Sequence, residues 1–243
     1  MSGHSKWHNI QQKKGKADKA RSNAFTKVSH AITLAARQGG GDPESNFTLR
    51  LAIDKAKEVN MPKDNIDRAI KRGTGELDDG SQIEEVLYEG FGPGGVAFIV
   101  ETMTDNKNRT VSEIKNIFSK HGGSLGGPNS VRWQFERKGV VRFSKEKKSA
   151  VADFDNFSLG LLDIGAEDVR ENEDFFEIIS PVDKFAAVVG AVKAVGIEPD
   201  TNDLEWLAKE KIDTDESTSN KVMSLYDALD ENDDVNNVYT NEA

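Results

Sequence analysis

The spacing of the apolar residues first changes near residues 74–82 of this 243-residue chain. Before this stretch, apolar residues recur every three or four positions, as in amphipathic helices. After it, short runs rich in Val, Ile and Phe predict strands. The stretch itself, Thr-Gly-Glu-Leu-Asp-Asp-Gly-Ser-Gln, is rich in turn residues and acids. We therefore expect an α+β fold in which a helical domain, a linker and a strand-rich remainder follow one another.

Three short helices are expected before the linker. Asp18 suits the N-cap of the first, which ends at Gly39-Gly40-Gly41, and Pro62 suits the first turn of the third, which ends at Gly73. Together they predict a three-helix bundle. A basic last helix also suggests a helix-turn-helix motif, but three glycines and Pro43 between the first two helices do not form its short turn.

The segment Gly90-Phe91-Gly92-Pro93-Gly94-Gly95 separates two expected strands, residues 83–89 and 96–102. It matches the pattern G-x-G-x-x-G of dinucleotide-binding loops. Such a loop opens a helix whose N-terminus receives the pyrophosphate, whereas the residues that follow here are strand-like. We therefore interpret the segment as a hairpin connection.

The polar loop Thr104–Thr110 precedes another expected helix, for which Thr110 and Glu113 form a capping-box pattern. Lys107 and Arg109 lie on this loop. They suit contact with a phosphate, because a helix N-terminus also attracts anions. A well-capped turn without a ligand explains the same residues equally well.

The second half of the chain predicts a split β-α-β arrangement. Its expected strands are 140–143, after a turn at Lys138-Gly139, then 166–170, 175–180 and 203–207, with helices near 148–162 and 182–195. A strand expected at 131–135 precedes it and belongs to the domain that begins with the strand at residue 83. A final helix (219–229) and strand (235–239) would complete the sheet that begins at residue 83. The expected domains are therefore residues 1–78, residues 79–136 with 211–243, and an inserted domain of residues 137–210.

Charge is strongly segregated along the chain. Residues 1–75 hold fifteen basic and seven acidic residues, whereas residues 149–243 hold six basic and twenty-four acidic ones. The first twenty-one residues form a basic arm that contains one acid, Asp18, together with Lys6, Trp7, Lys13, Lys14, Lys16, Lys19 and Arg21. Such an arm on an acidic body suggests contact with a polyanion, with Trp7 available to stack on a base. A solvated, poorly ordered terminus is the simpler alternative.

The sequence contains no recognisable catalytic motif, so we expect a protein that is not an enzyme and has no cofactor. Cysteine is absent, which excludes disulfides and thiolate ligands. His4 and His8 have the spacing of a helical metal site, but their neighbours form helices poorly, and we expect no metal. No apolar run is long enough for a membrane span, and we expect a cytoplasmic protein without a membrane partner. A monomer and a weak homo-oligomer both stay open.

Several motifs follow one another along almost the whole chain. They include Gly3-His4-Ser5-Lys6-Trp7, Gly39-Gly40-Gly41-Asp42-Pro43, Asn60-Met61-Pro62-Lys63-Asp64, Ala69-Ile70-Lys71-Arg72-Gly73, Tyr88-Glu89-Gly90-Phe91-Gly92-Pro93 and Thr104-Asp105-Asn106-Lys107-Asn108-Arg109-Thr110. Together they resemble the YebC/PmpR family. The resemblance implies an N-terminal helical domain followed by two ferredoxin-like α/β domains with antiparallel sheets.

The resemblance also implies two classes of function. The family is described as probable transcriptional regulators that bind DNA, and its mitochondrial relatives as translational activators. Some bacterial members resemble ribosome-associated factors that bind ribosomal RNA and relieve stalling at proline-rich stretches. Lysines on a flexible arm suit folded RNA, and no base-reading element is evident, so both classes stay open. The expected nucleic-acid contacts are His4, Lys6, Trp7, Lys13, Lys14, Lys16, Arg21, Lys27, Arg68, Lys71, Arg72, Lys107 and Arg109.

Overall fold

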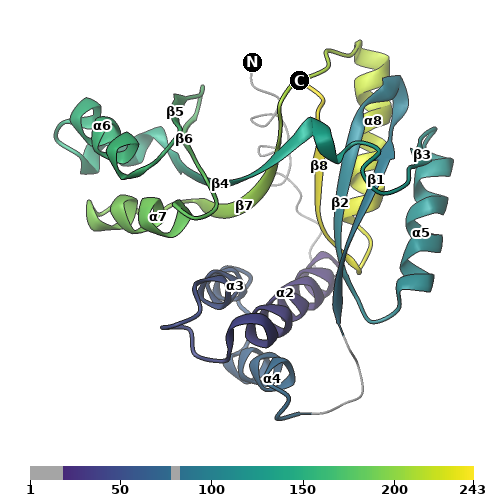
Figure 1. The fold of residues 1–243 in the computed structure, drawn as a ribbon, viewed down its shortest axis with the longest axis horizontal. Helices are drawn as coiled ribbons and strands as arrows, with labels where there is room; N and C mark the ends of the chain where they lie inside the picture. The colour runs from purple at the N-terminus through teal and green to yellow at the C-terminus, as the bar shows by residue number, and fades with distance from the viewer. Residues whose placement is uncertain (1–18, 78–82) are drawn as a thin grey trace. The chain divides into compact units, whose positions relative to one another are not determined.

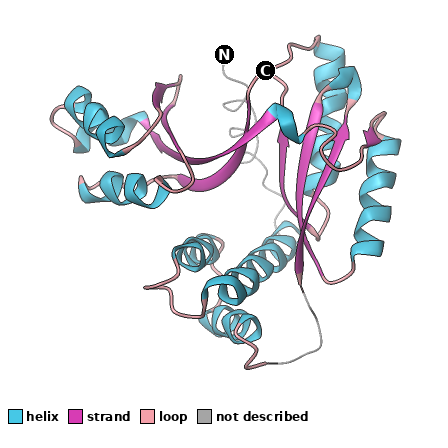
Figure 2. Ribbon diagram, in the orientation of Figure 1, coloured by secondary structure: helices cyan, strands magenta, loops and turns pink. Residues whose placement is uncertain are grey.

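The computed structural model describes the backbone of residues 19–77 and 83–243 (Figures 1 and 2). Side chains are described for residues 24–77 and 83–243. Its described residues fall into two compact units. One contains Phe135–Lys209, and the other contains the residues before Phe135 and after Lys209. No helix of the described residues is long and apolar enough to cross a membrane.

The second of these units begins with three helices, α2 (Lys19–Gly39), α3 (Phe47–Glu58) and α4 (Lys63–Gly73), as the sequence predicts. Their apolar faces form a shared core that includes Ile32, Leu49, Ala56, Ile66 and Ala69. Asn46 closes the connection between α2 and α3. Its Oδ1 accepts a hydrogen bond from the Leu49 amide (3.0 Å), and its Nδ2 donates to the carbonyl oxygens of Ala35 and Gly40 (both 2.8 Å).

Helices α2 and α4 pack with almost no space between their backbones. A Cβ atom on Gly73 would lie 2.4 Å from the carbonyl oxygen of Thr33, so only glycine allows this approach. The buried Thr33 hydroxyl hydrogen-bonds to the carbonyl oxygen of Ala69 at 3.1 Å. The same hydroxyl also lies 2.9 Å from the Ser29 carbonyl oxygen in its own helix, so it bridges the backbones of α2 and α4.

The same unit contains a four-stranded antiparallel sheet in the order β3-β1-β2-β8. Its strands are β1 (Glu84–Phe91), β2 (Ala97–Thr104), β3 (Ser124–Leu125) and β8 (Val235–Thr240), and its helices are α5 (Lys107–Lys120) and α8 (Glu216–Asp230). The glycine-rich segment is the β1–β2 hairpin connection, as expected, with a 3-10 turn at Pro93–Gly95. Element counting placed the chain's last strand in this sheet, and β8 pairs with β2.

The other unit has the β-α-β-β-α-β order of a split β-α-β domain. It comprises β4 (Phe135–Ser144), α6 (Phe154–Ile164), β5 (Asp168–Glu171), β6 (Phe175–Ser180), α7 (Phe185–Ala194) and β7 (Thr201–Ala208). The sheet is antiparallel, in the order β5-β6-β4-β7. Both α+β parts of the chain therefore contain four-stranded antiparallel sheets, which confirms the expected fold class.

The face of β4 that carries Phe143 packs on Phe154 of α6. Arg142, the preceding residue of the strand, points to the opposite face because side chains alternate. Its guanidinium pairs with Glu177 (2.8 Å) and Glu205, and Arg142 is only 4 % exposed. Burial alone lowers the pKa of Arg142, but the two carboxylates raise it by more, and the arginine stays charged.

Two details of the predicted elements are wrong. The expected strand at residues 131–135 is a 3-10 turn, Arg132–Gln134, and the expected turn at Lys138-Gly139 lies within the single strand β4. The buried Glu89 carboxylate explains the first difference, because it accepts hydrogen bonds from the amides of Asn129, Val131 and Arg132 (each 2.8 Å) and bends the chain.

Two helix starts also differ. The α5 N-cap is Asn106, whose Oδ1 accepts from the Arg109 amide at 3.1 Å, so the capping box predicted at Thr110 is wrong. The helix expected near residues 148–162 begins later, at Phe154 behind the N-cap Asp153, and a separate 3-10 segment spans Lys145–Ala150.

Candidate nucleic-acid interface

Part of the predicted interface lies outside the described residues. This part comprises His4, Lys6, Trp7, Lys13, Lys14 and Lys16. Arg21 lies in the first turns of α2, with its side chain outside the described set. The predicted contacts whose side chains are described are therefore Lys27, Arg68, Lys71, Arg72, Lys107 and Arg109.

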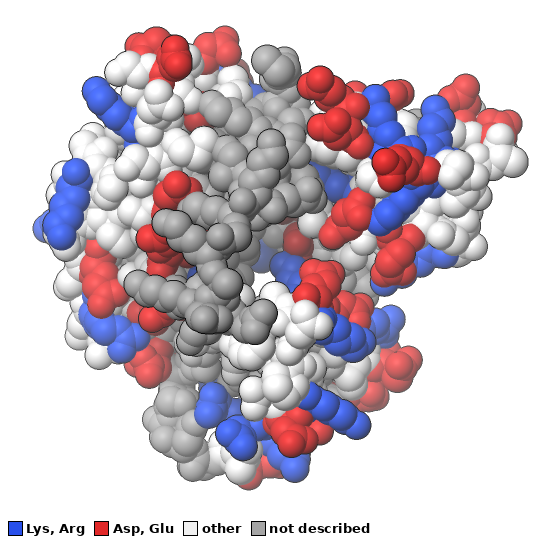
Figure 3. All heavy atoms as spheres, turned by 180° about the vertical axis from the view of Figure 1, so that it is seen from behind, with Lys and Arg blue, Asp and Glu red and all other residues white. Residues whose placement is uncertain are grey.

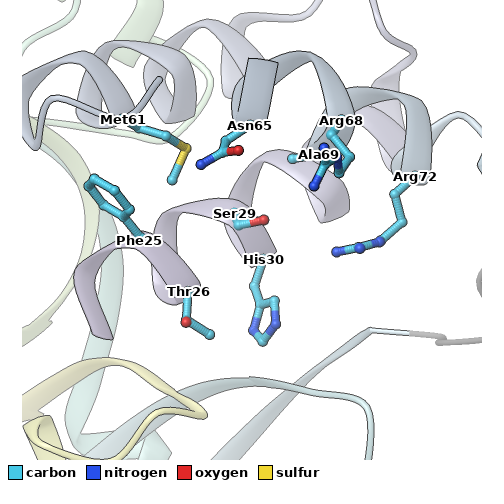
Figure 4. Close-up of a pocket in the computed structure, with 9 residues that line it drawn as sticks. All are labelled: Phe25, Thr26, Ser29, His30, Met61, Asn65, Arg68, Ala69 and Arg72. Carbon is cyan, nitrogen blue, oxygen red and sulfur yellow. The ribbon is translucent and has the colours of Figure 1, made fainter. Parts of the chain in front are cut away.

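A pocket of about 300 Å³ opens between α2 and α4 (Figure 4). It is lined by Phe25, Thr26, Ser29, His30, Met61, Asn65, Arg68, Ala69 and Arg72. Phe25 and Met61 lie toward one end of the pocket in Figure 4, whereas Arg68 and Arg72 lie toward the other. The lining contains two arginines and no carboxylate, so the pocket favours an anionic ligand that also has an apolar part.

The helical period explains why these side chains converge. The α4 residues Asn65, Arg68, Ala69 and Arg72 follow one another at intervals of three, one and three, which places them on one helix face. The α2 residues of the pocket come from two successive turns, 25–26 and 29–30. Gly73 and Thr33 hold these two faces together just beyond the pocket.

His30 is a pocket residue whose pKa is shifted. Burial lowers the pKa of the imidazole below its ordinary value and is the largest effect, although a hydrogen bond with the Met103 backbone and the charges of Asp234 and Asp105 oppose it. The nearby Arg72 adds to the lowering. The ring is therefore predominantly neutral at pH 7 and can donate one hydrogen bond and accept another.

The sequence suggested that Lys27 contacts a nucleic acid, but the structure places its side chain in a largely buried ion pair. Its ammonium group donates to the backbone oxygen of Asp230 at 2.6 Å and lies 3.2 Å from the carboxylate oxygen Oδ1 of the same residue. Only 16 % of the Lys27 side chain is exposed. It joins α2 to the C-terminal end of α8, where a cation also balances the helix dipole.

Lys107 and Arg109 are also paired with acids. Lys107 lies 2.6 Å from a carboxylate oxygen of Glu84. Arg109 contacts Asp105 at 3.1 Å and the buried Asp234 at 2.9 Å, and Asp234 chiefly raises the pKa of Arg109. The two cations therefore join the N-terminus of α5 to β1, through Glu84, and to the segment before β8, through Asp234.

The predicted contacts thus divide into two groups. Arg68 and Arg72 come together in the pocket, and Lys71 is exposed on α4 beside them. Within the described part of the chain, neither Arg68 nor Lys71 forms an ion pair, whereas Lys27, Lys107 and Arg109 do. On the face drawn in Figure 3, basic and acidic side chains of the described residues are interspersed, so the pocket is the more distinctive feature.

Sequence reasoning missed the rest of the lining. It gave no role in the interface to Phe25, Thr26, Ser29 or Asn65. The spacing of Asn65, Arg68 and Arg72 on α4 was the available signal, because these three polar residues share one helix face. The packing of that face beside α2 is not visible in the spacing. The described residues contain no cluster of His, Asp and Glu that could hold a metal ion.

Family comparisons cover both parts of the chain. Residues 5–76 match the TACO1/YebC protein N-terminal domain, and residues 83–242 match the TACO1/YebC second and third domain. The chain belongs to the TACO1/YebC family. The pocket therefore lies in the N-terminal domain of a TACO1/YebC protein, and both antiparallel sheets lie in the part matched by the second and third domains.

Relatives in this family are similar over almost their whole length. A protein of Persephonella marina is 50% identical over 243 residues, which cover 99% of this chain and 95% of the relative. A protein of Syntrophus aciditrophicus is 49% identical over 241 residues, with the same coverage. Each is called a probable transcriptional regulatory protein. The crystal structure of a conserved hypothetical protein from Aquifex aeolicus superposes with a TM-score of 0.83 at 40% identity, covering 95% of this chain and 93% of that one.

Proposed function

We propose that this protein is a non-enzymatic regulator of gene expression that binds nucleic acid through its N-terminal helical domain. The observation that carries the proposal is the convergence of Arg68 and Arg72 in a pocket without carboxylates. This pocket lies in the most basic part of the chain, since residues 1–75 have a net charge of plus eight. Cations concentrated in one domain release counterions when they meet a phosphate chain, which is the main source of affinity for nucleic acids.

The names of the relatives support DNA as the target, because they are called probable transcriptional regulatory proteins. In this form of the proposal, the basic arm and α4 grip duplex DNA through its phosphates. The pocket arginines add two charge-assisted contacts to that grip.

A feature of α4 favours RNA as the second candidate. The exposed residues of its first two turns include Asp64 and Asp67. A recognition helix places its first turns in the major groove between two rows of phosphates, where carboxylates are repelled. Folded RNA offers unpaired nucleotides that a pocket can hold without a helix entering a groove. The alternative is therefore a translation factor that binds ribosomal RNA and relieves stalling at proline-rich stretches.

The test compares binding of the full chain to duplex DNA and to a structured ribosomal RNA fragment over a range of salt concentrations. Fluorescence anisotropy should show binding that weakens with salt. Replacing Arg68 and Arg72 together by Ala should lower the slope of log K against log salt by about 0.7–0.9 for each phosphate that an arginine no longer neutralises. No binding to either nucleic acid at low salt would refute the proposal.

The two candidates are separated in cells. A transcriptional regulator should crosslink to chromatin at defined places, whereas a translation factor should sediment with ribosomes and alter ribosome occupancy at particular codons when it is deleted. Crosslinking to neither would argue against both candidates.

A further inference from the structure

The pocket between α2 and α4 has two chemically different ends. Phe25 and Met61 provide an aromatic ring and a thioether at one end, and Arg68 and Arg72 provide guanidinium groups at the other (Figure 4). Hydroxyl and amide groups lie between them, from Thr26, Ser29 and Asn65. This order of apolar, polar and cationic groups is complementary to a base, a sugar and a phosphate.

We propose that the pocket holds one unpaired nucleotide of a nucleic acid strand, with its base against Phe25 and its phosphate on Arg68 and Arg72. The inference rests on the proposed function and adds the state of the ligand, which is single-stranded at this point. Asn65 and Ser29 can hydrogen-bond to the sugar or to the edge of the base.

The size of the pocket supports a single nucleotide. At about 300 Å³ it lies at the lower limit of small-ligand sites, which matches one base with its sugar and phosphate better than a base pair. A free phosphate would leave the apolar end empty. An acidic peptide would satisfy the arginines, whereas stacking on an aromatic ring is the general way in which proteins hold unpaired bases.

The rigidity of the pocket supports the same ligand. The hydrogen bond from Thr33 to Ala69 and the close packing at Gly73 fix the distance between the two helices. A preformed pocket loses little conformational freedom on binding, which favours affinity for a small ligand. A base in a duplex must first be unpaired and turned out, which costs free energy that an unpaired base does not need. The pocket should therefore discriminate against paired strands.

The experiment measures the affinity of the full chain for a labelled single-stranded oligonucleotide and for the duplex of the same sequence at one salt concentration. Phe25→Leu keeps an apolar side chain but removes the ring, and Arg68→Ala removes one guanidinium. Lys63→Ala is the matched control for charge, because it removes one cation from the exposed surface of the same helix outside the pocket.

Loss of the stacking ring should weaken single-strand binding by roughly five- to a hundredfold and leave duplex binding almost unchanged. Arg68→Ala should weaken single-strand binding more than Lys63→Ala does. Equal losses for Arg68→Ala and Lys63→Ala, with no effect of Phe25→Leu, would overturn the pocket proposal but leave nucleic-acid binding intact. A wild-type protein that binds no strand of either kind would instead overturn the proposed function.

A crosslinking measurement does not depend on the folding of variants. A strand that carries 5-bromouracil is irradiated in complex with the wild-type chain, and the attached peptide is identified by mass spectrometry. Crosslinks within residues 24–30 or 61–72 are expected. Crosslinks confined to other segments would show that the unpaired base lies elsewhere.

Discussion

The pKa of His30 is set by opposing effects of burial, a hydrogen bond and nearby charges. The charged groups that face the ring are Arg72 of α4, Asp105 after β2, and Asp234 before β8. Burial outweighs the acids and lowers the pKa of the ring from its ordinary value of 6.5. The folded protein therefore binds a proton at His30 more weakly than the unfolded chain does.

This difference predicts how stability depends on pH at the residue scale. Because the folded-state pKa is lowered, the stabilising contribution is complete above the unfolded-state pKa of about 6.5 and is lost as pH falls through the folded-state value. His30→Gln should flatten the stability profile between about pH 7.5 and pH 5. Urea unfolding at several pH values measures the effect. Identical profiles for both proteins, or an NMR titration midpoint of His30 above 6.5, would contradict it.

At the scale of elements, the contact between α2 and α4 controls the pocket. Gly73 lies where its Cβ would meet the Thr33 carbonyl oxygen at 2.4 Å and the Ala36 Cβ at 2.7 Å. Backbone atoms cannot move aside as a flexible side chain can. A methyl group at this position must therefore separate the helices and widen the pocket between them.

Gly73→Ala is accordingly expected to destabilise its unit by about 1–3 kcal/mol, as overpacked cores generally do. Gly190→Ala is the matched control, because Gly190 lies in α7 with no atom within 4 Å of an added Cβ. The control should stabilise its own unit by about 0.5–1 kcal/mol, since alanine is the better helix former. Denaturant unfolding distinguishes the two signs, and a Gly73→Ala protein as stable as the wild type would show that the helices separate freely.

Elements were predictable from the sequence where local chemistry decides them. Glycines and prolines mark the ends of α2, α3 and α4, and periodicity shows their inward faces. The local pattern at Gly139 indicates a turn. In the structure, however, a Cβ added at this position would lie 2.4 Å from the Phe185 ring of α7, so packing inside strand β4 requires glycine here. The local pattern at Thr110 indicates a cap, but its hydroxyl is used by the distant Asp234 at 2.7 Å.

The candidate site was predictable only in part for the same reason. The basic face of α4 is visible in the sequence, whereas the pocket requires the position of α2 beside it. Lys27 has the spacing of a surface residue, and its partner Asp230 lies 203 residues further along the chain. Contacts between residues so far apart depend on the tertiary fold and leave no local pattern.

Charge is unevenly distributed along the whole chain. Residues 149–243 carry a net charge of minus eighteen, whereas residues 1–75 carry plus eight. A phosphate chain is therefore attracted to the first part of the protein and repelled by the last. The excess of acids in the last part of the chain limits unspecific coating of a long polyanion.

The asymmetry predicts that the position of a charge matters more than the net charge. Replacing Lys13, Lys14 and Lys16 together by Ala should lower the slope of log K against log salt by up to about three times 0.7–0.9, because each lysine that contacts a phosphate releases a counterion. The control replaces Lys209, Lys211 and Lys221, which removes the same three charges from the acidic part of the chain. Its slope should stay near that of the wild type. Equal changes in both triple variants would mean that affinity follows net charge, and the basic arm would then have no special part in binding.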